Sequence, residues 1–266
     1  MNVKNIEILK EIFNWYSFLE LTEKEIQICA EKLNSQLPEN FLFNCTRKFH
    51  KKCEIFGLDR KPVLFLKYVR DKYVLEVLGL HIAKKFFDPE LCFTNYLTGL
   101  YGEKKPVPYI MTTYEEGKHI GKYDVSKFKF LLGRQCYFHE VLSLYDVHDR
   151  HFIVKSENSL CRIDFGLCFE SIQKKYWGFI EYLNHKKLDY NDADFQKGYN
   201  HEKDLMLNNL KGKQSDLNLL IKKIGKLQRD NVIVVFYPDR FVTRLIDHWS
   251  RIGFLEDAQL IQFDWD

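Results

Sequence analysis

Residues 142–166 read LSLYDVHDRHFIVKSENSLCRIDFG and contain the side chains on which the fold assignment depends. A polar loop with Asp146 and His151 comes first. Two apolar runs follow, HFIVK and LCRIDF, and turn residues 156–158 separate them, which is typical of a β-hairpin. The second run ends in the tripeptide DFG at 164–166. The stretch therefore predicts a loop and a hairpin that bring the acidic side chains of its two ends close together.

The spacing within this stretch resembles that of a known superfamily. Asp146 precedes Asp164 by eighteen residues, and His151 precedes it by thirteen. In protein kinases, similar distances separate the catalytic-loop Asp, the metal-ligand Asn and the Asp of DFG. The pattern Asp146-x-His148-x-x-His151 resembles the phosphoinositide-kinase-like and HipA-like branches, which carry Asp-x-His-x-x-Asn or a close relative. The resemblance covers residues 128–170, and the run FLLGRQCYFHEVLSLYD looks like the helix that leads into the catalytic loop.

This resemblance implies a fold and a set of roles. The fold would be α+β and two-lobed, a protein-kinase-like fold with a small β-rich N-lobe, one inserted helix and a mainly helical C-lobe. Phosphoryl transfer needs a carboxylate near the attacking hydroxyl and oxygen ligands for a metal ion. By resemblance, Asp146 would be the base or orienting group, Asp164 the principal metal ligand and His151 a second ligand. ATP and Mg²⁺ or Mn²⁺ would be the cofactors, and His148 would orient the loop. The competing interpretation is an ordinary hairpin with surface aspartates and a turn glycine.

A second register takes Asp149-Arg150-His151 as the catalytic triplet, which is similar to Asp-Arg-His in lipid kinases. It leaves fifteen residues to Asp164 and puts Val154 at the position of the metal-ligand Asn. We prefer the register with Asp146.

A lysine within an apolar run marks the first lobe. Lys67 lies in VLFLKYV, where a strand is expected, and Glu76 follows in YVLEVLGLHIAKKF, an expected helix. The resemblance implies an ion pair between them that orients Lys67 toward the α- and β-phosphates. The alternative is an edge-strand lysine, since charges protect sheet edges.

Residues 109–117, YIMTTYEEG, resemble the strand and hinge that bind adenine in kinases. By this resemblance, Met111 would be the gatekeeper, and the backbone of Thr112 and Tyr114 would contact the base.

The chain departs from the kinase pattern in three places. No glycine-rich loop precedes Lys67, because residues 45–57, CTRKFHKKCEIFG, contain one glycine at the end. The backbone amides of such a loop normally bind phosphate. Basic side chains of this segment could bind the phosphate instead. The alternative is that these side chains form only a solvated basic face. Tyr145 stands where these branches usually have glycine. His151 replaces an Asn, although Mg²⁺ prefers oxygen ligands and imidazole suits transition metals. The basic candidates for phosphate contacts are Arg47, Lys48, Lys51 and Lys52.

Periodicity and turn residues predict the other elements. Thr22 followed by Glu25 is a capping box, so a helix is expected from there to about residue 37. We further expect helices over 3–20, 71–87 and 125–144, short strands within 41–70, strands near 92–101 and 107–114, and a helical region 171–266 with one apolar run at 232–238. The expected domains are a helical extension at 1–38, an N-lobe at 39–114 and a C-lobe at 115–266.

The composition is that of a globular protein. Apolar residues make up 45% and charged residues 29%, as in globular proteins, and the net charge of +3 is too small to imply nucleic-acid binding. Seven cysteines without CxxC pairs indicate reduced thiols, and Cys168 is expected to be buried and inert.

No apolar run reaches the roughly 18 residues of a membrane span, and Lys and Glu interrupt the N-terminal apolar pattern, unlike in a signal peptide. We therefore expect a cytoplasmic location, or a host cytoplasm after export.

Two functions remain open. The first is an ATP- and metal-dependent kinase that phosphorylates a hydroxyl of a protein Ser/Thr, a lipid headgroup or a small molecule. The second is a pseudokinase, a catalytically degenerate nucleotide-binding or scaffolding module. The missing glycine loop and His151 favour the second, and the retained Lys67, Asp146 and Asp164 favour the first. Nucleic acid is not an expected partner, because the only feature of the sequence that favours it is a scatter of basic residues.

Overall fold

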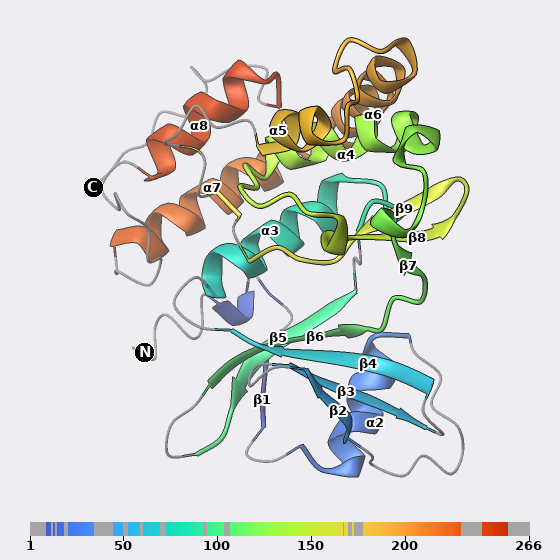
Figure 1. Ribbon diagram of the computed structural model, residues 1–266. Coiled ribbons are helices and arrows are strands. Elements are labelled where there is room, and N and C mark those ends of the chain that lie inside the picture. The colour runs from blue at the N-terminus through green and yellow to red at the C-terminus, as the bar shows by residue number, and fades with distance from the viewer. Residues whose placement is uncertain are drawn as a thin grey trace.

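A computed structural model of the protein is α+β, with a six-stranded mixed sheet, a three-stranded sheet and helices among the residues it describes (Figure 1). The described residues are 9–11, 13, 15–18, 21–34, 45–49, 53–58, 61–69, 73–92, 95–103, 107–166, 168–169, 172, 178–229 and 241–254, with the backbone alone at 45–49, 53–58, 61, 214, 228 and 229.

The larger sheet has the strand order β1-β5-β6-β4-β3-β2. β1 runs parallel to β5, and the other neighbouring pairs are antiparallel. The strands expected within 41–70, 92–101 and 107–114 are confirmed. The six strands of this sheet are β1 (Trp15–Phe18), β2 (Cys45–Phe49), β3 (Cys53–Leu58), β4 (Lys61–Tyr68), β5 (Tyr96–Tyr101) and β6 (Val107–Thr113).

Strand β1 corrects the helix expected over 3–20. Residues 9–11 are helical, but Trp15–Phe18 form a strand in which Trp15 pairs with Thr98 and Phe18 with Tyr101. Aromatic residues suit a half-buried pleated surface. Here the pairing with a distant strand outweighs the local helical periodicity.

Helix α2 (Glu23–Lys32) covers one face of this sheet. The expected capping box is confirmed, since Thr22 Oγ1 accepts from the Glu25 N–H at 3.4 Å and the Glu25 carboxylate accepts from the Thr22 N–H at 2.8 Å. The helix ends at Lys32, earlier than expected. Its buried side chains, Ile26 among them, pack in one apolar cluster with Leu64 and Leu66 of β4.

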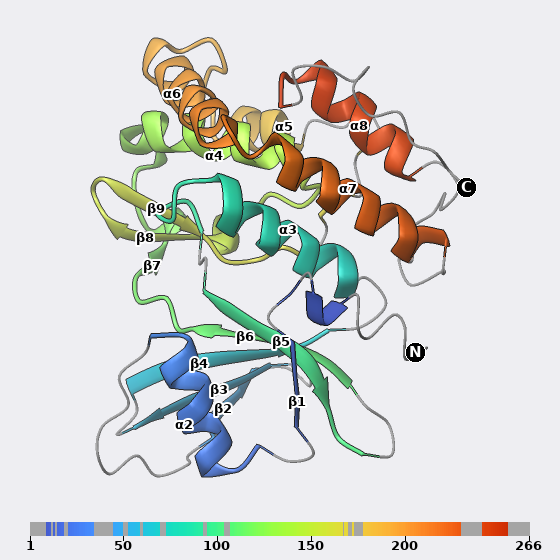
Figure 2. The same cartoon turned by 180° about the vertical axis from the view of Figure 1, so that it is seen from behind.

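Helix α3 (Tyr73–Phe86) covers the opposite face and confirms the helix expected at 71–87. In both views it lies between the larger sheet and the later helices, and Figure 2 shows α2 on the other side of the sheet. Leu75, Leu78, Ile82 and Phe86 are all buried in the largest apolar cluster. That cluster also includes residues of the later helices, so α3 joins the sheet to the helical part of the fold.

The smaller sheet consists of β7 (Lys118–His119), β8 (Phe152–Ser156) and β9 (Ser159–Arg162) in that order. β8 and β9 form the hairpin expected from the sequence. The Arg162 N–H donates to the Leu91 carbonyl at 2.7 Å, which connects β9 to the segment after α3.

The later helices form the layer on the far side of α3 (Figure 1). A 3-10 turn at Val125–Phe128 leads into α4, which confirms most of the helix expected at 125–144. The helical prediction for 171–266 is confirmed in α5 to α8, and the run at 232–238 lies outside the described residues. These helices are α4 (Lys129–Val141), α5 (Gly178–His185), α6 (Ala193–Leu210), α7 (Gln214–Arg229) and α8 (Phe241–Arg251).

Two glycines let α4 and α6 cross closely. A Cβ atom on Gly198 would lie 1.9 Å from the Phe130 carbonyl oxygen, and one on Gly133 would lie 2.0 Å from that of Phe195. Each helix therefore needs a residue without a side chain at the crossing.

Among the described residues, no helix combines the length and apolar character needed to cross a membrane.

Candidate functional site

Lys67 lies between two carboxylates that are distant in the sequence. Its Nζ is 2.6 Å from Glu76 Oε1 and 3.0 Å from Asp164 Oδ1. The ion pair expected between Lys67 and Glu76 is therefore present. Burial alone would lower the pKa of Lys67, but the two carboxylates raise it above its usual value, so the ammonium stays charged. These contacts join β4, α3 and the segment that follows β9.

Strand alternation explains why Lys67 points to this site. Leu64 and Leu66 face α2, and neighbouring residues of a strand point to opposite faces. Lys67 pairs in register with Ile110, whose side chain is in the core on the α3 side. Since β4 lies between β3 and β6 in the sheet, the edge-strand interpretation of Lys67 is wrong.

Asp164 is held by its own chain as well as by Lys67. Its Oδ1 accepts from the Gly166 N–H at 2.9 Å. A Cβ atom on Gly166 would lie 3.2 Å from Asp164 Oδ1 and 3.4 Å from Lys67 Nζ, so glycine keeps this space open. Burial by itself would raise the pKa of Asp164, but Lys67 and the Gly166 N–H lower it to about 2. Asp164 is therefore a carboxylate at neutral pH, with 42% of its side chain exposed.

The loop before β8 places two histidines around Asp146. His148 Nε2 is 2.8 Å from Asp146 Oδ1, which agrees with the orienting role expected for His148. His151 Nε2 lies 3.8 Å from Asp146 Oδ2 and 3.9 Å from Asp164 Oδ2, so this ring stands between the two carboxylates. Burial, together with the nearby Arg162 cation, lowers the pKa of His151 to about 4, and the ring is neutral at pH 7.

The buried side chain of Arg162 connects the backbone at Asp146 to the backbone at Asp164. Its Nη2 donates to the Asp146 carbonyl at 2.9 Å, and its Nε donates to the Asp164 carbonyl at 2.7 Å. Its Nη1 lies 3.1 Å from His139 Nε2, and the guanidinium stands over the ring of Phe152. Arg162 is only 1% exposed. Sequence reasoning missed it, although a charged residue inside the apolar run LCRIDF was a signal of the same kind as Lys67.

The second register is disfavoured by the contacts of Asp149. Its carboxylate accepts from Lys186 Nζ at 2.5 Å and from the Tyr182 hydroxyl at 2.9 Å. Val154, which that register puts at a metal-ligand position, is a buried apolar side chain of β8. Asp149 is therefore bound by α5 and by the residue that follows it, whereas Asp146 shares a close neighbour, His151, with Asp164.

The positions predicted to contact adenine need correction. Met111 pairs with Leu66 and is buried against α2, so its side chain points away from the face that carries Lys67. Thr112 lies inside β6, paired with strands on both sides. The Tyr114 N–H already donates to the Val63 carbonyl at 2.8 Å. The Met111 side chain therefore does not have the orientation of a gatekeeper, and the Tyr114 N–H already has a partner within the sheet.

A metal ion at this site would share its coordination between protein side chains and the phosphates of a substrate. Across the part of the chain that the structure describes, no three or more His, Cys, Asp or Glu side chains are grouped to hold a metal. Mg²⁺ in phosphate-transfer sites is commonly held by one or two carboxylates plus the phosphates of the substrate. Asp164 fits such a role, and neutral His151 fits Mn²⁺ better than Mg²⁺.

Other candidates contribute less to the site. Cys168 is buried, and burial raises the pKa of its thiol well above the usual value, as expected for an inert cysteine. The side chains of Arg47, Lys48, Lys51 and Lys52, proposed from the sequence for phosphate contacts, lie outside the described part of the structure.

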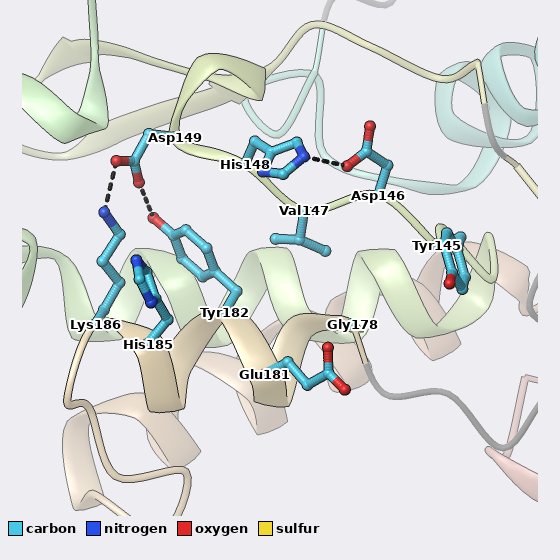
Figure 3. A pocket seen from close by; sticks show the side chains of 10 residues that line it. All are labelled: Tyr145, Asp146, Val147, His148, Asp149, Gly178, Glu181, Tyr182, His185 and Lys186. Carbon is cyan, nitrogen blue, oxygen red and sulfur yellow. Dashed lines mark hydrogen bonds and ion pairs between the residues drawn. The ribbon is translucent and has the colours of Figure 1, made fainter.

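A pocket of about 470 Å³ opens beside Asp146, between the loop at 145–149 and α5 (Figure 3). Glu181 and Lys186 line its α5 side. Sequence reasoning did not single out these residues, since nothing local shows that α5 faces this loop.

Protein-family models and curated protein sequences give no match to this chain, so its function is proposed from the geometry of the site.

Proposed function

We propose that this chain is an atypical kinase-like phosphotransferase that uses ATP and a divalent metal ion to phosphorylate a hydroxyl group. The observation that carries the proposal is the position of Lys67, with Nζ 2.6 Å from Glu76 and 3.0 Å from Asp164. In protein kinases a strand Lys, a helix Glu and the Asp of DFG must be in place together for phosphate transfer. A buried ion pair of purely structural value would not require the DFG sequence or Asp146.

Each residue of the site would have a separate role in the reaction. Lys67, oriented by Glu76, would bind the α- and β-phosphates of ATP. Asp146, oriented by His148, would accept the proton of the acceptor hydroxyl as its oxygen attacks the γ-phosphorus. The bond from that phosphorus to the bridging oxygen would break, and ADP would leave. Asp164 and His151 would hold Mg²⁺ or Mn²⁺, which supplies charge neutralisation at the phosphates when bound.

The two-lobed kinase architecture is part of this proposal. The larger sheet with α3 would be the N-lobe, and the smaller sheet with α4 to α8 would be the C-lobe. Lys67 on β4, Glu76 on the following helix and Asp164 after a hairpin have the chain order of the kinase signature residues, which supports this assignment.

The test is nucleotide binding and ATP turnover with Mg²⁺ and with Mn²⁺, for the wild type and for Asp164→Asn, Asp146→Asn and Lys67→Met. We expect Asp164→Asn and Lys67→Met to abolish metal-dependent turnover, and Asp146→Asn to lower it by about 10²–10⁴-fold. Lys155→Met is the matched control, because Lys155 is a half-exposed lysine of the surface hairpin that forms an ion pair with Glu115 at 2.7 Å. Turnover that survives Asp164→Asn would overturn the proposal.

A pseudokinase is the second candidate. It is favoured by His151 in place of an Asn and by the absence of a glycine-rich sequence before Lys67. Nucleotide binding that needs Lys67 but is accompanied by no turnover with any metal or acceptor would support it.

A further inference from the structure

His139 is a buried histidine near the C-terminal end of α4. Its Nε2 lies 3.1 Å from Arg162 Nη1. A guanidinium has only N–H donors and stays charged, so the histidine nitrogen is the acceptor of this hydrogen bond. Burial, together with the Arg162 cation, holds the pKa of His139 well below its usual value. The ring is therefore neutral, with its proton on Nδ1.

Two aromatic rings fix the orientation of this imidazole. Phe152 of β8 stacks on it, with ring centroids 5.6 Å apart and planes inclined by 25°, and Phe179 of α5 meets it edge-on at 4.9 Å. The guanidinium of Arg162 lies over the same Phe152 ring, 5.6 Å from its centroid. His139 therefore presents its acceptor nitrogen to Arg162 from a position that packing holds in place.

The polar role of His139 lies in its contact with Arg162. Of the two ring nitrogens, only Nε2 has a hydrogen-bond partner among the residues that the structure describes. The surroundings of the ring are aromatic, so a phenylalanine would suit the packing. The contact that requires a nitrogen atom is the one with Arg162.

Arg162 relays this contact to the two acidic segments. Its Nη2 and Nε donate to the carbonyls of Asp146 and Asp164, at 2.9 Å and 2.7 Å. A guanidinium is a rigid planar fork, so a third partner on Nη1 fixes the direction of the other two hydrogen bonds. The His139 carbonyl also accepts from the Leu144 N–H at 3.1 Å, where α4 leads into the loop of Asp146.

We propose that His139 is a positioning residue for phosphate transfer, an inference that rests on the proposed kinase function. As a neutral imidazole it accepts a hydrogen bond from Arg162 and fixes the guanidinium that sets the separation of Asp146 and Asp164. Because only 3% of His139 is exposed, it contacts neither nucleotide nor acceptor and acts through Arg162.

The test compares two substitutions of His139. His139→Phe keeps an aromatic ring against Phe152 but removes the acceptor, whereas the amide oxygen of His139→Gln can take the place of Nε2. We expect kcat to fall about 10–100-fold in His139→Phe with the ATP affinity unchanged, and most of the rate to return in His139→Gln. His248→Phe is the matched control and should leave kcat unchanged, because His248 also lies 3.1 Å from an arginine, Arg251, but in α8.

A double-mutant cycle shows whether His139 acts through Arg162. In an Arg162→Met background, His139→Phe should cause no further loss of kcat, since residues that act as a unit are not additive. Additive losses, or equal losses in His139→Phe and His139→Gln, would overturn the inference.

NMR of the Arg162 guanidinium follows the contact without turnover. The Nε–H signal, assigned by its loss in Arg162→Met, should exchange with water faster in His139→Phe than in the wild type and in His139→Gln. If the wild type turns over ATP and His139→Phe does so equally fast, the positioning role is wrong and the kinase function stands. If the wild type has no turnover with any metal, the kinase function fails and the positioning role fails with it.

Discussion

Arg162 Nη2 donates a hydrogen bond to the carbonyl oxygen of Asp146 at 2.9 Å, from a side chain that is almost fully buried. Its Nε donates to the carbonyl of Asp164 at 2.7 Å. One planar guanidinium therefore sets the separation of the two backbone segments that present the acidic side chains. Burial lowers the pKa of Arg162 to about 10, which still leaves it charged at neutral pH.

Replacing Arg162 should affect turnover more than nucleotide binding. Arg162→Met keeps much of the side-chain volume but frees both carbonyls, so we expect kcat to fall about 10–100-fold, the range seen when outer-shell partners of a site are lost. Affinity for ATP should change little, because Lys67 and Glu76 are untouched. Arg162→Lys should recover only part of the rate, since an ammonium lacks the planar fork.

Steady-state kinetics and ADP titration, with melting temperatures, check this prediction. Arg150→Met is the control, because Arg150 is an exposed arginine of the same loop. Equal losses of kcat and nucleotide affinity, in step with a lower melting temperature, would mean that Arg162 only supports the fold.

His151 should set the metal preference of the reaction. Its neutral ring suits Mn²⁺, whereas an amide oxygen at this position suits Mg²⁺. We expect the wild type to turn over ATP faster with Mn²⁺ and His151→Asn to shift the ratio of rates toward Mg²⁺ by about tenfold. Rates at matched metal concentrations measure this ratio. His119→Asn, an exposed histidine of β7, should leave it unchanged. An unchanged ratio in His151→Asn would exclude His151 from the metal site.

Some of these relationships could be predicted from the sequence because their signals are local. The capping box of Thr22 and Glu25 spans four residues, and the pattern alone indicates where α2 begins. Lys67 was recognisable as a charge in an apolar strand, with Glu76 in the next helix. Both features depend on residues that are near each other in the chain.

Other relationships depend on strand register and tertiary pairing, which no local pattern reveals. The side-chain direction of Met111 follows from its pairing with Leu66, and a shift by one residue would have turned it toward the site. The periodicity of residues 3–20 predicts a helix, because nothing local shows that β1 pairs with β5, a strand about eighty residues further along the chain. The face that α5 presents to the loop at 145–149 depends in the same way on the packing of distant helices.

The crossing of α4 and α6 predicts a large effect of a small substitution. In an ordinary helix Gly→Ala stabilises by about 1 kcal/mol. Gly198→Ala should instead destabilise by about 1–3 kcal/mol, because its Cβ would stand 1.9 Å from the backbone oxygen of Phe130. Chemical denaturation measures the difference. Asp204→Ala, on the exposed side of the same helix, should cost nothing, and a stable Gly198→Ala would show that the helices can separate freely.

The free energy of unfolding should fall at acidic pH, because His81 is held neutral in the folded state. Burial, with the cations Lys85, Lys84 and Lys223, lowers the pKa of His81 to about 4, and its ring packs against Phe13. The unfolded state therefore binds a proton near pH 6.5 that the folded state does not. Stability should decline as the pH falls from about 6.5 to about 4, by up to about 3 kcal/mol from this group.

Denaturation curves at pH 7, 5.5 and 4.5 test this pH dependence. His81→Gln should lose less stability on acidification than the wild type. His119→Gln, an exposed histidine, should behave like the wild type. An identical pH slope for wild type and His81→Gln would contradict the assignment.

The parallel pairing of β1 with β5 also has a consequence for how the chain is made. Trp15 is translated more than eighty residues before its partner Thr98. Until then, the backbone groups of β1 have no ladder to join, and β5, once made, has an open edge available to any other strand. Completion of the sheet must therefore wait for a long-range loop closure, a slow kind of step. The interval before it is when a nascent chain is most exposed to pairing with a neighbour.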